Sequence, residues 1–386
     1  MRPAEQRQQR MPPIRKDIPM TKFISELAAG LVPYVPGEQP KGRKFIKLNT
    51  NENPYPPSEQ VLRAVREEAS SLRLYPDPQA DAVRDAAAAY YNEAFGLTGG
   101  EALNRDNIFA GNGSDEVLSL LCPAFFTGKK IAFADITYSF YPSFLSLFAV
   151  PYEQIPLAED FSVRIEDYLA LDDTVGGIIL CNPNAPTGRG LPLADIERIL
   201  EGSRNRLVVV DEAYVDFGGE SCIPLTKEYD NLLVVQTFSK SRSLAGARLG
   251  YAIGDARLIA DLDAVRCSMN PYNVNSMSLA AGAAALEDDA YYRDNCRRIE
   301  KTRQETEKRL REMGFAVLPS RANFLFAAPP DGDGGAYYRR LKQRGVLVRH
   351  FKLPRIAPYV RISIGTPEQM DVLLRRTEKI LKEGQP

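Results

Sequence analysis

The sequence predicts an α/β protein in which strands and helices alternate through the middle of the chain and a smaller α+β domain follows. Two observations support this prediction. Short continuous apolar runs, typical of buried parallel strands, lie at 176–181, 207–210 and 232–236, with helical patterns such as Leu193–Leu200 between them. After about residue 275 the pattern changes to long helices and then short strands. Right-handed crossovers would bring the carboxyl ends of the middle strands to one edge, where such sheets bind ligands.

The elements are predicted in chain order from apolar spacing. Residues 1–40, rich in Pro, Arg and Gln, are expected to form an N-terminal arm with a short helix near Lys22–Ala29. A large domain is expected over 41–275, with helices at 58–70 and 78–95. The C-terminal domain, 276–386, is predicted to contain an Ala-rich helix, a charged helix to Met313, strands at 315–318, 323–327, 346–349 and 359–364, and a closing helix.

Composition narrows the range of functions. The 386 residues are 44% apolar and 26% charged, which suits a folded chain and excludes a disordered one. A net charge of -1 gives no reason to expect nucleic acid or an anionic membrane as partner. A single histidine, His350, excludes a multi-histidine metal site and disfavours a Ser-His-Asp hydrolase, so no metal is predicted.

Targeting signals are not evident. The first twenty residues contain no apolar core of a signal peptide, and no eighteen apolar residues run together anywhere. The five cysteines are widely spaced and form no CxxC pair, which a reducing compartment permits. A soluble cytoplasmic protein with a small-molecule ligand is therefore expected.

Each of the three middle strands ends in a polar cluster. The clusters are NPNAPTG with Asn182, DEAY with Asp211 and Tyr214, and TFSKSRSLAGARLGY with Lys240. Any one cluster is also what turns and helix caps require, but three in succession favour a shared site.

The third cluster indicates amine chemistry. A lysine at the end of a buried strand loses solvation, so its pKa falls and its amine becomes nucleophilic. Such a lysine can form a Schiff base. Around Lys240, the side chains of Thr237, Ser239 and Arg248 could bind a dianionic phosphate.

Two further segments suit a flat, phosphorylated ligand. Asp211 could pair with a pyridinium N–H, and Tyr214 could reach a phenolic oxygen on the same ring. In GNGSDEVLSLL, the amides of Ser114 and Asp115 open a helix and would face an anion. Tyr138 could stack on the ring, although an aromatic run such as Tyr138, Phe140, Tyr141 and Phe144 is more often part of a core.

Together these motifs resemble the fold-type I aminotransferases that use pyridoxal 5'-phosphate, and among them the histidinol-phosphate aminotransferases. KLNTNENPYPPS, RLYPD, GNGSDE, NPNAPTG, VVVDEAY, TFSKSRSLAGARLGY, ANFLF and YVRISIG occur in the family's order from about Tyr34 to Gly365. The resemblance implies a mixed, mostly parallel sheet in a large domain, a smaller α+β C-terminal domain, and a homodimer with shared active sites.

The resemblance also implies roles for individual residues. Lys240 matches the Schiff-base lysine, Asp211 the partner of the ring nitrogen, and Tyr214 a donor to the ring oxygen. Other cofactor-binding residues would be Ser114, Asp115, Tyr138, Asn182, Thr237, Ser239 and Arg248, with Tyr75 reaching the neighbouring subunit's cofactor phosphate. Substrate-binding residues would be Tyr34, Asn53, Arg349 and Arg361, although an arginine at a strand end can equally pair with a surface carboxylate.

One position departs from the family pattern. Family members usually read NPNNPTG, and the second of the adjacent asparagines bonds the ring oxygen, whereas this chain has Ala185 there. Asn182 or Asn184 could compensate, or Tyr214 could act alone.

The resemblance implies reversible transamination between L-histidinol phosphate and 2-oxoglutarate in histidine biosynthesis, with ping-pong kinetics. Two alternatives share the scaffold: an aromatic or broad-range aminotransferase, and a threonine-phosphate decarboxylase. A non-catalytic cofactor-binding regulator is disfavoured, because an arm of about forty residues is too short for a fused DNA-binding domain.

Overall fold

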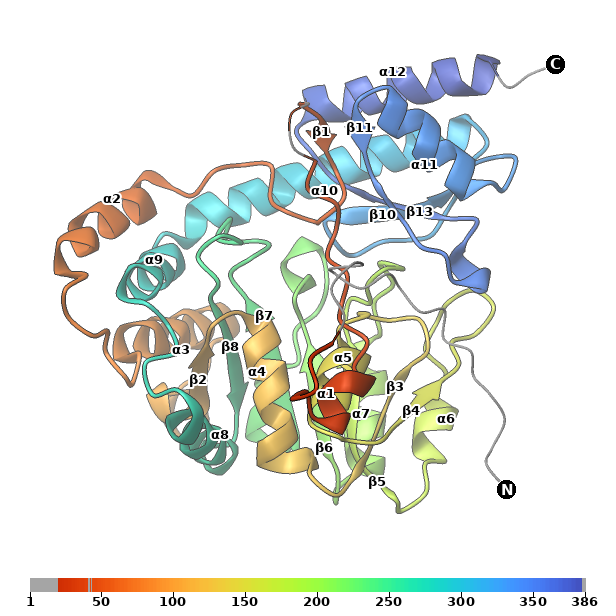
Figure 1. The fold of residues 1–386 in the computed structure, drawn as a ribbon. Helices are drawn as coiled ribbons and strands as arrows, with labels where there is room; N and C mark the ends of the chain where they lie inside the picture. The colour runs from red at the N-terminus through yellow and green to blue at the C-terminus, as the bar shows by residue number, and fades with distance from the viewer. Residues whose placement is uncertain (1–19, 41, 43, 384–386) are drawn as a thin grey trace.

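The computed structural model describes residues 20–40, 42 and 44–383. A seven-stranded sheet lies between two layers of helices, and a smaller antiparallel sheet lies beside it under long C-terminal helices (Figure 1). The predicted α/β fold with a mixed, mostly parallel sheet is confirmed.

The large sheet has the strand order β2-β8-β7-β6-β5-β3-β4. Strand β8 runs antiparallel to both of its neighbours, and the other neighbouring strands are parallel. The continuous apolar runs predicted from sequence form its centre, because a strand covered on both faces is apolar at every position. Its strands are β2 (Ile108–Gly111), β3 (Lys130–Ala134), β4 (Tyr152–Ile155), β5 (Val175–Cys181), β6 (Leu207–Asp211), β7 (Leu232–Thr237) and β8 (Gly250–Gly254).

Alternate residues of the central strands face opposite layers. Val208 and Val210 pack in one apolar cluster and Val209 in another, as the two-residue period of a strand requires. The first layer is formed by α3 (Asp81–Phe95), α6 (Ile165–Leu169), α7 (Leu193–Gly202) and α9 (Ser276–Glu287). The second layer is formed by α4 (Ser114–Leu121), α5 (Tyr141–Leu147) and α8 (Ala256–Met269). Helix α2 (Glu59–Glu68) packs on α9.

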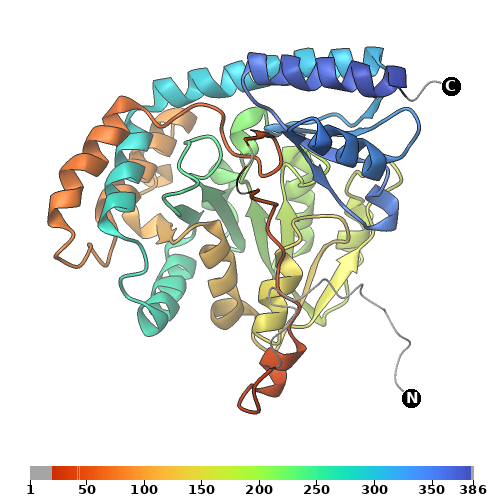
Figure 2. The same ribbon diagram turned by 45° about the horizontal axis from the view of Figure 1, so that its top comes forward.

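The smaller sheet is antiparallel, in the order β12-β13-β10-β9. The long helices α10 and α12 run side by side along one edge of the molecule (Figure 2). The elements of this part are α10 (Asp289–Glu312), β9 (Ala316–Val317), β10 (Phe324–Ala328), α11 (Gly334–Gln343), β11 (Val346–Leu347), β12 (Arg349–His350), β13 (Val360–Ser363) and α12 (Pro367–Glu383).

The N-terminal segment joins this smaller part. Strand β1 (Ile46–Lys47) pairs in parallel with β11, and Leu48 packs in the apolar cluster of the C-terminal elements. The single strand predicted over 346–349 is therefore two strands, because β11 pairs with β1 while β12 pairs with β13.

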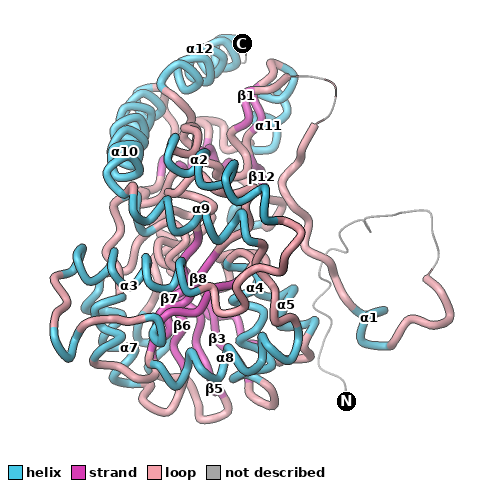
Figure 3. Tube along the Cα trace, turned by 90° about the vertical axis from the view of Figure 1, so that its left-hand side faces the viewer, coloured by secondary structure: helices cyan, strands magenta, loops and turns pink. Residues whose placement is uncertain are grey.

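The short N-terminal helix begins later than predicted. Helix α1 (Glu26–Gly30) starts after Ser25, whose side chain accepts a hydrogen bond from the N–H of Ala28 and so caps the helix. Its residues are exposed, and Figures 2 and 3 show α1 projecting from the rest of the chain.

Neither a membrane-spanning helix nor a metal-binding group of side chains is present among the described residues. None of these residues forms a helix long and apolar enough to cross a membrane. Within the same part of the chain, no three His, Cys, Asp or Glu side chains are grouped so that they could hold a metal ion.

Candidate active site

The carboxyl ends of β5, β6 and β7 meet at one edge of the large sheet. The parallel register pairs Cys181 with Asp211 and Asp211 with Val235. The backbone N–H of Asn182 donates to the Asp211 carbonyl at 2.9 Å. The polar clusters predicted at the three strand ends are therefore brought together.

Asp211 is a deeply buried carboxylate. It is 3% exposed, and it accepts hydrogen bonds from the Tyr141 hydroxyl at 2.7 Å and from the Ala213 N–H at 3.2 Å. Burial raises the pKa of Asp211 to about 6, while the two hydrogen bonds act in the opposite direction. A cation placed against this carboxylate would favour its ionised form.

Lys240 follows β7 and lies beside Tyr214. Its Nζ is 5.7 Å from the centre of the Tyr214 ring. Burial, and next the positive charge of Arg361, lower the pKa of Lys240 to about 8. This shift makes the neutral, nucleophilic amine several hundred times more abundant at neutral pH than in an exposed lysine, at about tenfold per unit. The Asn53 side chain donates to the carbonyls of Lys240 at 3.0 Å and Ser241 at 3.1 Å, which holds the lysine backbone.

The start of α4 presents free amides. Gly113 precedes the helix with φ 81°, a conformation that favours glycine, and no hydrogen bond among the described residues uses the N–H of Ser114 or Asp115. Gly250 of β8 lies so close that an added Cβ would be 2.3 Å from the Ser114 nitrogen. This close approach brings β8 against the helix start, where an anion would be favoured.

Polar side chains from the third cluster lie beside the free amides of Ser114 and Asp115; together these groups form what we call the cradle. The Arg248 guanidinium contacts the Asp115 carboxylate at 3.1 Å and donates to the Ser239 hydroxyl at 3.4 Å. The Ser239 N–H donates to the Thr237 hydroxyl at 3.1 Å. The Tyr138 hydroxyl donates to Asp115 at 3.0 Å, so its ring lies beside the same helix start.

Arg349 and Arg361 are directly opposite each other on β12 and β13. Both guanidinium groups lie near the Phe351 ring, at 5.6 and 5.7 Å from its centre. Arg349 donates to the carbonyls of Val35 and Pro36 in the N-terminal arm, at 3.1 and 3.3 Å. Two adjacent cations can bind a doubly charged anion in bidentate fashion.

Arg361 has a hydrogen-bond donor that no described residue uses. One of its terminal nitrogens donates to the Asn49 carbonyl at 3.1 Å, whereas its Nε is buried with no partner among the described residues. Burial lowers the pKa of Arg361. Tyr34 of the arm packs edge-on against Tyr138 and Phe140, with ring centres 6.2 and 5.8 Å away, so the arm lies over the same region.

Tyr214 follows β6 and is buried beside Lys240. Its hydroxyl oxygen accepts a hydrogen bond from the Asn51 side chain at 3.0 Å, and burial raises its pKa to about 12. Ala185 packs in the same apolar cluster and is 2% exposed. Asn182 uses both side-chain polar atoms on the backbone of Leu191, at 2.8 and 3.3 Å.

Asn184 is likewise engaged within its own loop. Its Nδ2 donates to the Ile136 carbonyl and to the Thr187 hydroxyl, each at 2.9 Å, and its Oδ1 accepts from Thr137 at 2.8 Å. Asn184 has thus used both of its amide hydrogens, whereas Tyr214 keeps a hydroxyl hydrogen that no described residue accepts.

Comparisons with known proteins identify the family of this chain. Residues 43–376 match the family model described as aminotransferase class I and II. A histidinol-phosphate aminotransferase of Pseudomonas putida is 49% identical over 357 residues, 92% of this chain and 99% of the relative. One from Aromatoleum aromaticum is 48% identical over 94% of this chain and 100% of the relative. The chain belongs to the histidinol-phosphate aminotransferases, within the class I and II aminotransferases.

A solved structure supports the fold. The histidinol-phosphate aminotransferase of Sinorhizobium meliloti, in complex with pyridoxal-5'-phosphate, has a TM-score of 0.82 at 23% identity and covers 94% of this chain and 99% of its own. The resemblance inferred from the motifs is therefore confirmed, and so is the fold class.

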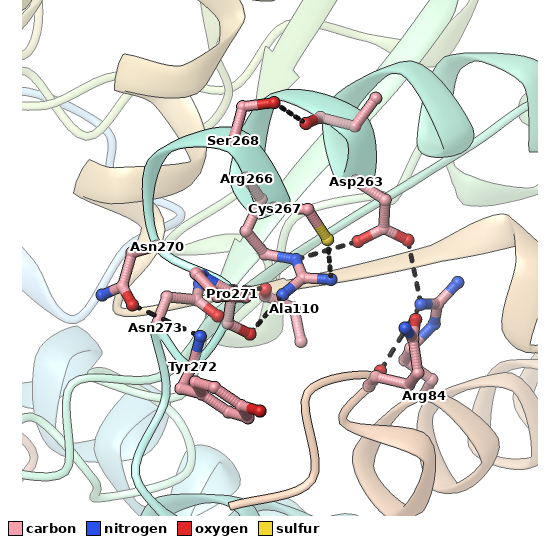
Figure 4. A network of polar contacts seen from close by, with 12 residues as sticks. Arg84, Ala110, Asp263, Arg266, Cys267, Ser268, Asn270, Pro271, Tyr272 and Asn273 are labelled. Atoms are coloured by element: carbon pink, nitrogen blue, oxygen red, sulfur yellow. Dashed lines mark hydrogen bonds and ion pairs between the residues drawn. The ribbon is translucent and has the colours of Figure 1, made fainter.

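Tyr75 lies on the surface, and its own chain covers little of its side chain. It is 81% exposed and stacks on Tyr272, with ring centres 4.5 Å apart and 21° between planes. A polar network fixes the loop that carries Tyr272 (Figure 4). In it, Asp263 pairs with Arg84 and Arg266, each at 3.0 Å, and Arg266 donates to the Pro271 carbonyl at 2.8 Å.

This network reaches the cradle. The Asn273 side chain, next to Tyr272 in the loop, donates to Glu116 in the first turn of α4, and Glu116 also accepts from the N–H of Asn112 at 2.6 Å. The loop and the helix start are thereby held in one arrangement.

Sequence reasoning missed several of these residues. The aromatic run around Tyr138 predicts Tyr141 as a core residue, and only the structure shows that its hydroxyl donates to Asp211. Asn51 lies within the KLNTNENPYPPS motif without a predicted role, and Tyr272 lies outside every motif. No pattern in the sequence marks them, because each acts through a contact with a distant segment.

Proposed function

We propose that this chain transfers an amino group between L-histidinol phosphate and 2-oxoglutarate, using pyridoxal 5'-phosphate bound at the edge of the large sheet. The observation that supports it most is one arrangement of two groups: a lysine with a depressed pKa, Lys240, and a buried acid with a raised pKa, Asp211, at the ends of adjacent strands. Paired perturbations of this kind mark catalytic sites.

The residues fit the cofactor. The free amides of Ser114 and Asp115, with Arg248, suit its phosphate; Asp211 suits a protonated ring nitrogen; and Tyr214 has a hydrogen to give to the ring oxygen. When bound, pyridoxal 5'-phosphate supplies an electron-withdrawing ring that stabilises negative charge on the substrate carbon.

With the cofactor bound, different side chains of this chain would have different roles in the reaction. Lys240 Nζ, neutral in an appreciable fraction of molecules near neutral pH, would take the proton from the substrate Cα and deliver it to the C4' atom of the cofactor. Asp211 keeps the ring nitrogen protonated. Arg349 and Arg361 bind the substrate phosphate in one half-reaction and a carboxylate of the acceptor in the other. Because one pocket serves both substrates in turn, the kinetics should be ping-pong.

We also propose that two copies of the chain share their active sites and that the protein works in the cytoplasm. Tyr75 is 81% exposed, and its neighbour Leu74 is exposed too, which suits a surface that a second copy covers. The five cysteines are free thiols, as in reducing compartments. Analytical ultracentrifugation of the wild-type protein and of Tyr75→Ala tests the assembly.

Two experiments test the reaction. Borohydride reduction of the cofactor-saturated protein, followed by peptide mapping, should label Lys240; a label elsewhere would overturn the assignment. Initial rates with histidinol phosphate, phenylalanine and threonine phosphate, each with wild type and Arg349→Ala, should show histidinol phosphate as the preferred substrate and the one most affected. Faster turnover of phenylalanine, or carbon dioxide release from threonine phosphate, would instead support the corresponding alternative.

A further inference from the structure

Asn51 lies at the centre of a small buried network between the two sheets. Its Nδ2 donates to the Tyr214 hydroxyl at 3.0 Å, and its Oδ1 accepts from the Ser363 hydroxyl at 2.9 Å. Its backbone N–H donates to Ser363 at 2.9 Å, and its carbonyl accepts from the Asn323 side chain at 2.9 Å. Asn51 is 1% exposed and has φ 57°, a left-handed conformation that asparagine tolerates better than most residues.

The network determines which way the Asn51 amide points. The Ser363 hydroxyl already accepts from the Asn51 N–H, so its hydrogen needs an acceptor, and the Asn51 Oδ1 receives it. The Nδ2 must then face Tyr214 as a donor. The Tyr214 oxygen therefore accepts, and its own hydrogen is left for another partner.

No described residue accepts that hydrogen. The Tyr214 ring packs edge-on against Phe324 at 5.1 Å, which fixes the ring but offers no acceptor. Ala185, in the same cluster, has only a methyl group. A buried hydroxyl hydrogen without an acceptor is costly, so this one points to a ligand oxygen.

We propose that Asn51 is a positioning residue, held by Ser363, that fixes the Tyr214 hydroxyl as a donor to the phenolic oxygen of the bound cofactor. The inference rests on the proposed function, since it takes pyridoxal 5'-phosphate as the ligand. It gives the chain an oriented donor at the ring oxygen, where Ala185 supplies none.

The variant Asn51→Asp tests the direction of the bond. An aspartate keeps the shape and tolerates the same backbone conformation, but it can only accept. The Tyr214 hydrogen would turn to the new carboxylate and away from the cofactor. Asn51→Ala, by contrast, removes the side-chain bonds to both Tyr214 and Ser363 but leaves that hydrogen free to reach the ring oxygen.

The readout is the pH dependence of the visible absorption band of the bound cofactor. A hydrogen bond from Tyr214 spreads the negative charge of the cofactor's ring oxygen. When this bond is lost, the charge is more concentrated and the oxygen holds a neighbouring proton more strongly. The proton then leaves only at higher pH, so the midpoint rises. The midpoint should rise by about one pH unit in Asn51→Asp, as expected for one bond to a charged group, and by less than half as much in Asn51→Ala. A purely structural Asn51 would give the opposite order, because the alanine variant loses more contacts.

Tyr214→Phe separates the possible failures. This variant should raise the midpoint by at least as much as Asn51→Asp, and adding Asn51→Asp to it should change nothing further. A further shift in the double variant would mean that the new charge acts through space, which would overturn the inference. If Tyr214→Phe shifts the midpoint and Asn51→Asp does not, the inference alone is wrong. If neither the wild type nor any variant shows the absorption band of a bound cofactor, the proposed function is wrong.

Ser363→Ala provides a second test in case circular dichroism shows that Asn51→Asp folds poorly. Without the serine hydroxyl, the Asn51 amide is free to turn over and accept from Tyr214. The midpoint should then rise by part of the Asn51→Asp shift, and an unchanged midpoint would refute the positioning role.

Discussion

The buried acid at the end of β6 allows a quantitative test of where the cofactor charge lies. A pKa for Asp211 of about 6 instead of 3.8 means that burial in the cofactor-free protein favours the neutral acid more than water does. At about 1.4 kcal/mol per unit, ionising Asp211 costs the empty fold about 3 kcal/mol. Because the folded-state pKa is raised, this cost is absent below about pH 4 and reaches its full value as pH rises through about 6, so the folded protein loses stability over that range.

Asp211→Asn should therefore have opposite effects in the two forms of the protein. Above neutral pH the cofactor-free variant should be more stable than wild type, by about 2 kcal/mol once the cost of reorienting the Tyr141 hydroxyl is subtracted. The same variant should bind pyridoxal 5'-phosphate about a hundredfold more weakly, since the 3 kcal/mol that a cationic ring relieves is no longer available. Turnover should fall with it.

The assay is urea unfolding of cofactor-free and cofactor-saturated protein at about pH 5 and about pH 8, on either side of the folded-state pKa. Glu212→Gln is the matched control. Glu212 is the next residue and is buried with a pKa raised to about 7, but Ser221, Cys222 and Gln236 already donate to it. It should leave the stabilisation by cofactor unchanged. If cofactor stabilises Asp211→Asn as strongly as wild type, Asp211 is only an acceptor for Tyr141 and the reasoning fails.

Three further substitutions have expected outcomes. Lys240→Ala should abolish turnover while the protein still binds pyridoxal 5'-phosphate, which dialysis should then remove; retained turnover would refute the assignment. Ala185→Asn should lower the pH midpoint of the cofactor band, because it adds a second donor at the ring oxygen; a rise would contradict this. Asp263→Asn should raise the dissociation constant of the cofactor several-fold, since it releases Arg266 and the loop beside the cradle; Arg257→Ala, which removes an exposed ion pair, is the control.

The sequence was sufficient for the centre of the large sheet. Strands β5, β6 and β7 are covered on both faces, so each is a continuous apolar run, and each ends in the polar residues that face the site. The proposed lysine, acid and anion-binding residues could be predicted because each stands in a local motif at the end of a strand or the start of a helix, and the parallel sheet brings the ends of β5, β6 and β7 to one edge.

Contacts between distant segments could not be predicted in this way. Strand β1 is two residues long and pairs with β11, about 300 residues further along the chain, so no local pattern marks it. The bonds from Asn51 to Tyr214 and Ser363 span 163 and 312 residues. Tyr141 looks like its aromatic neighbours until its hydroxyl is seen against Asp211. Each depends on tertiary packing that periodicity does not encode.

Strand β13 relates substrate recognition to the cofactor ring. Arg361 and Ser363 are two residues apart on this strand, so their side chains leave the same face. One lies opposite Arg349 in the proposed anion site, and the other holds Asn51 and through it Tyr214. A displacement of β13 would therefore misplace the substrate anion and the donor to the ring oxygen together. For this reason we expect substitutions in the core beneath β13 to alter both the Michaelis constant and the cofactor absorption, although none of them touches either ligand.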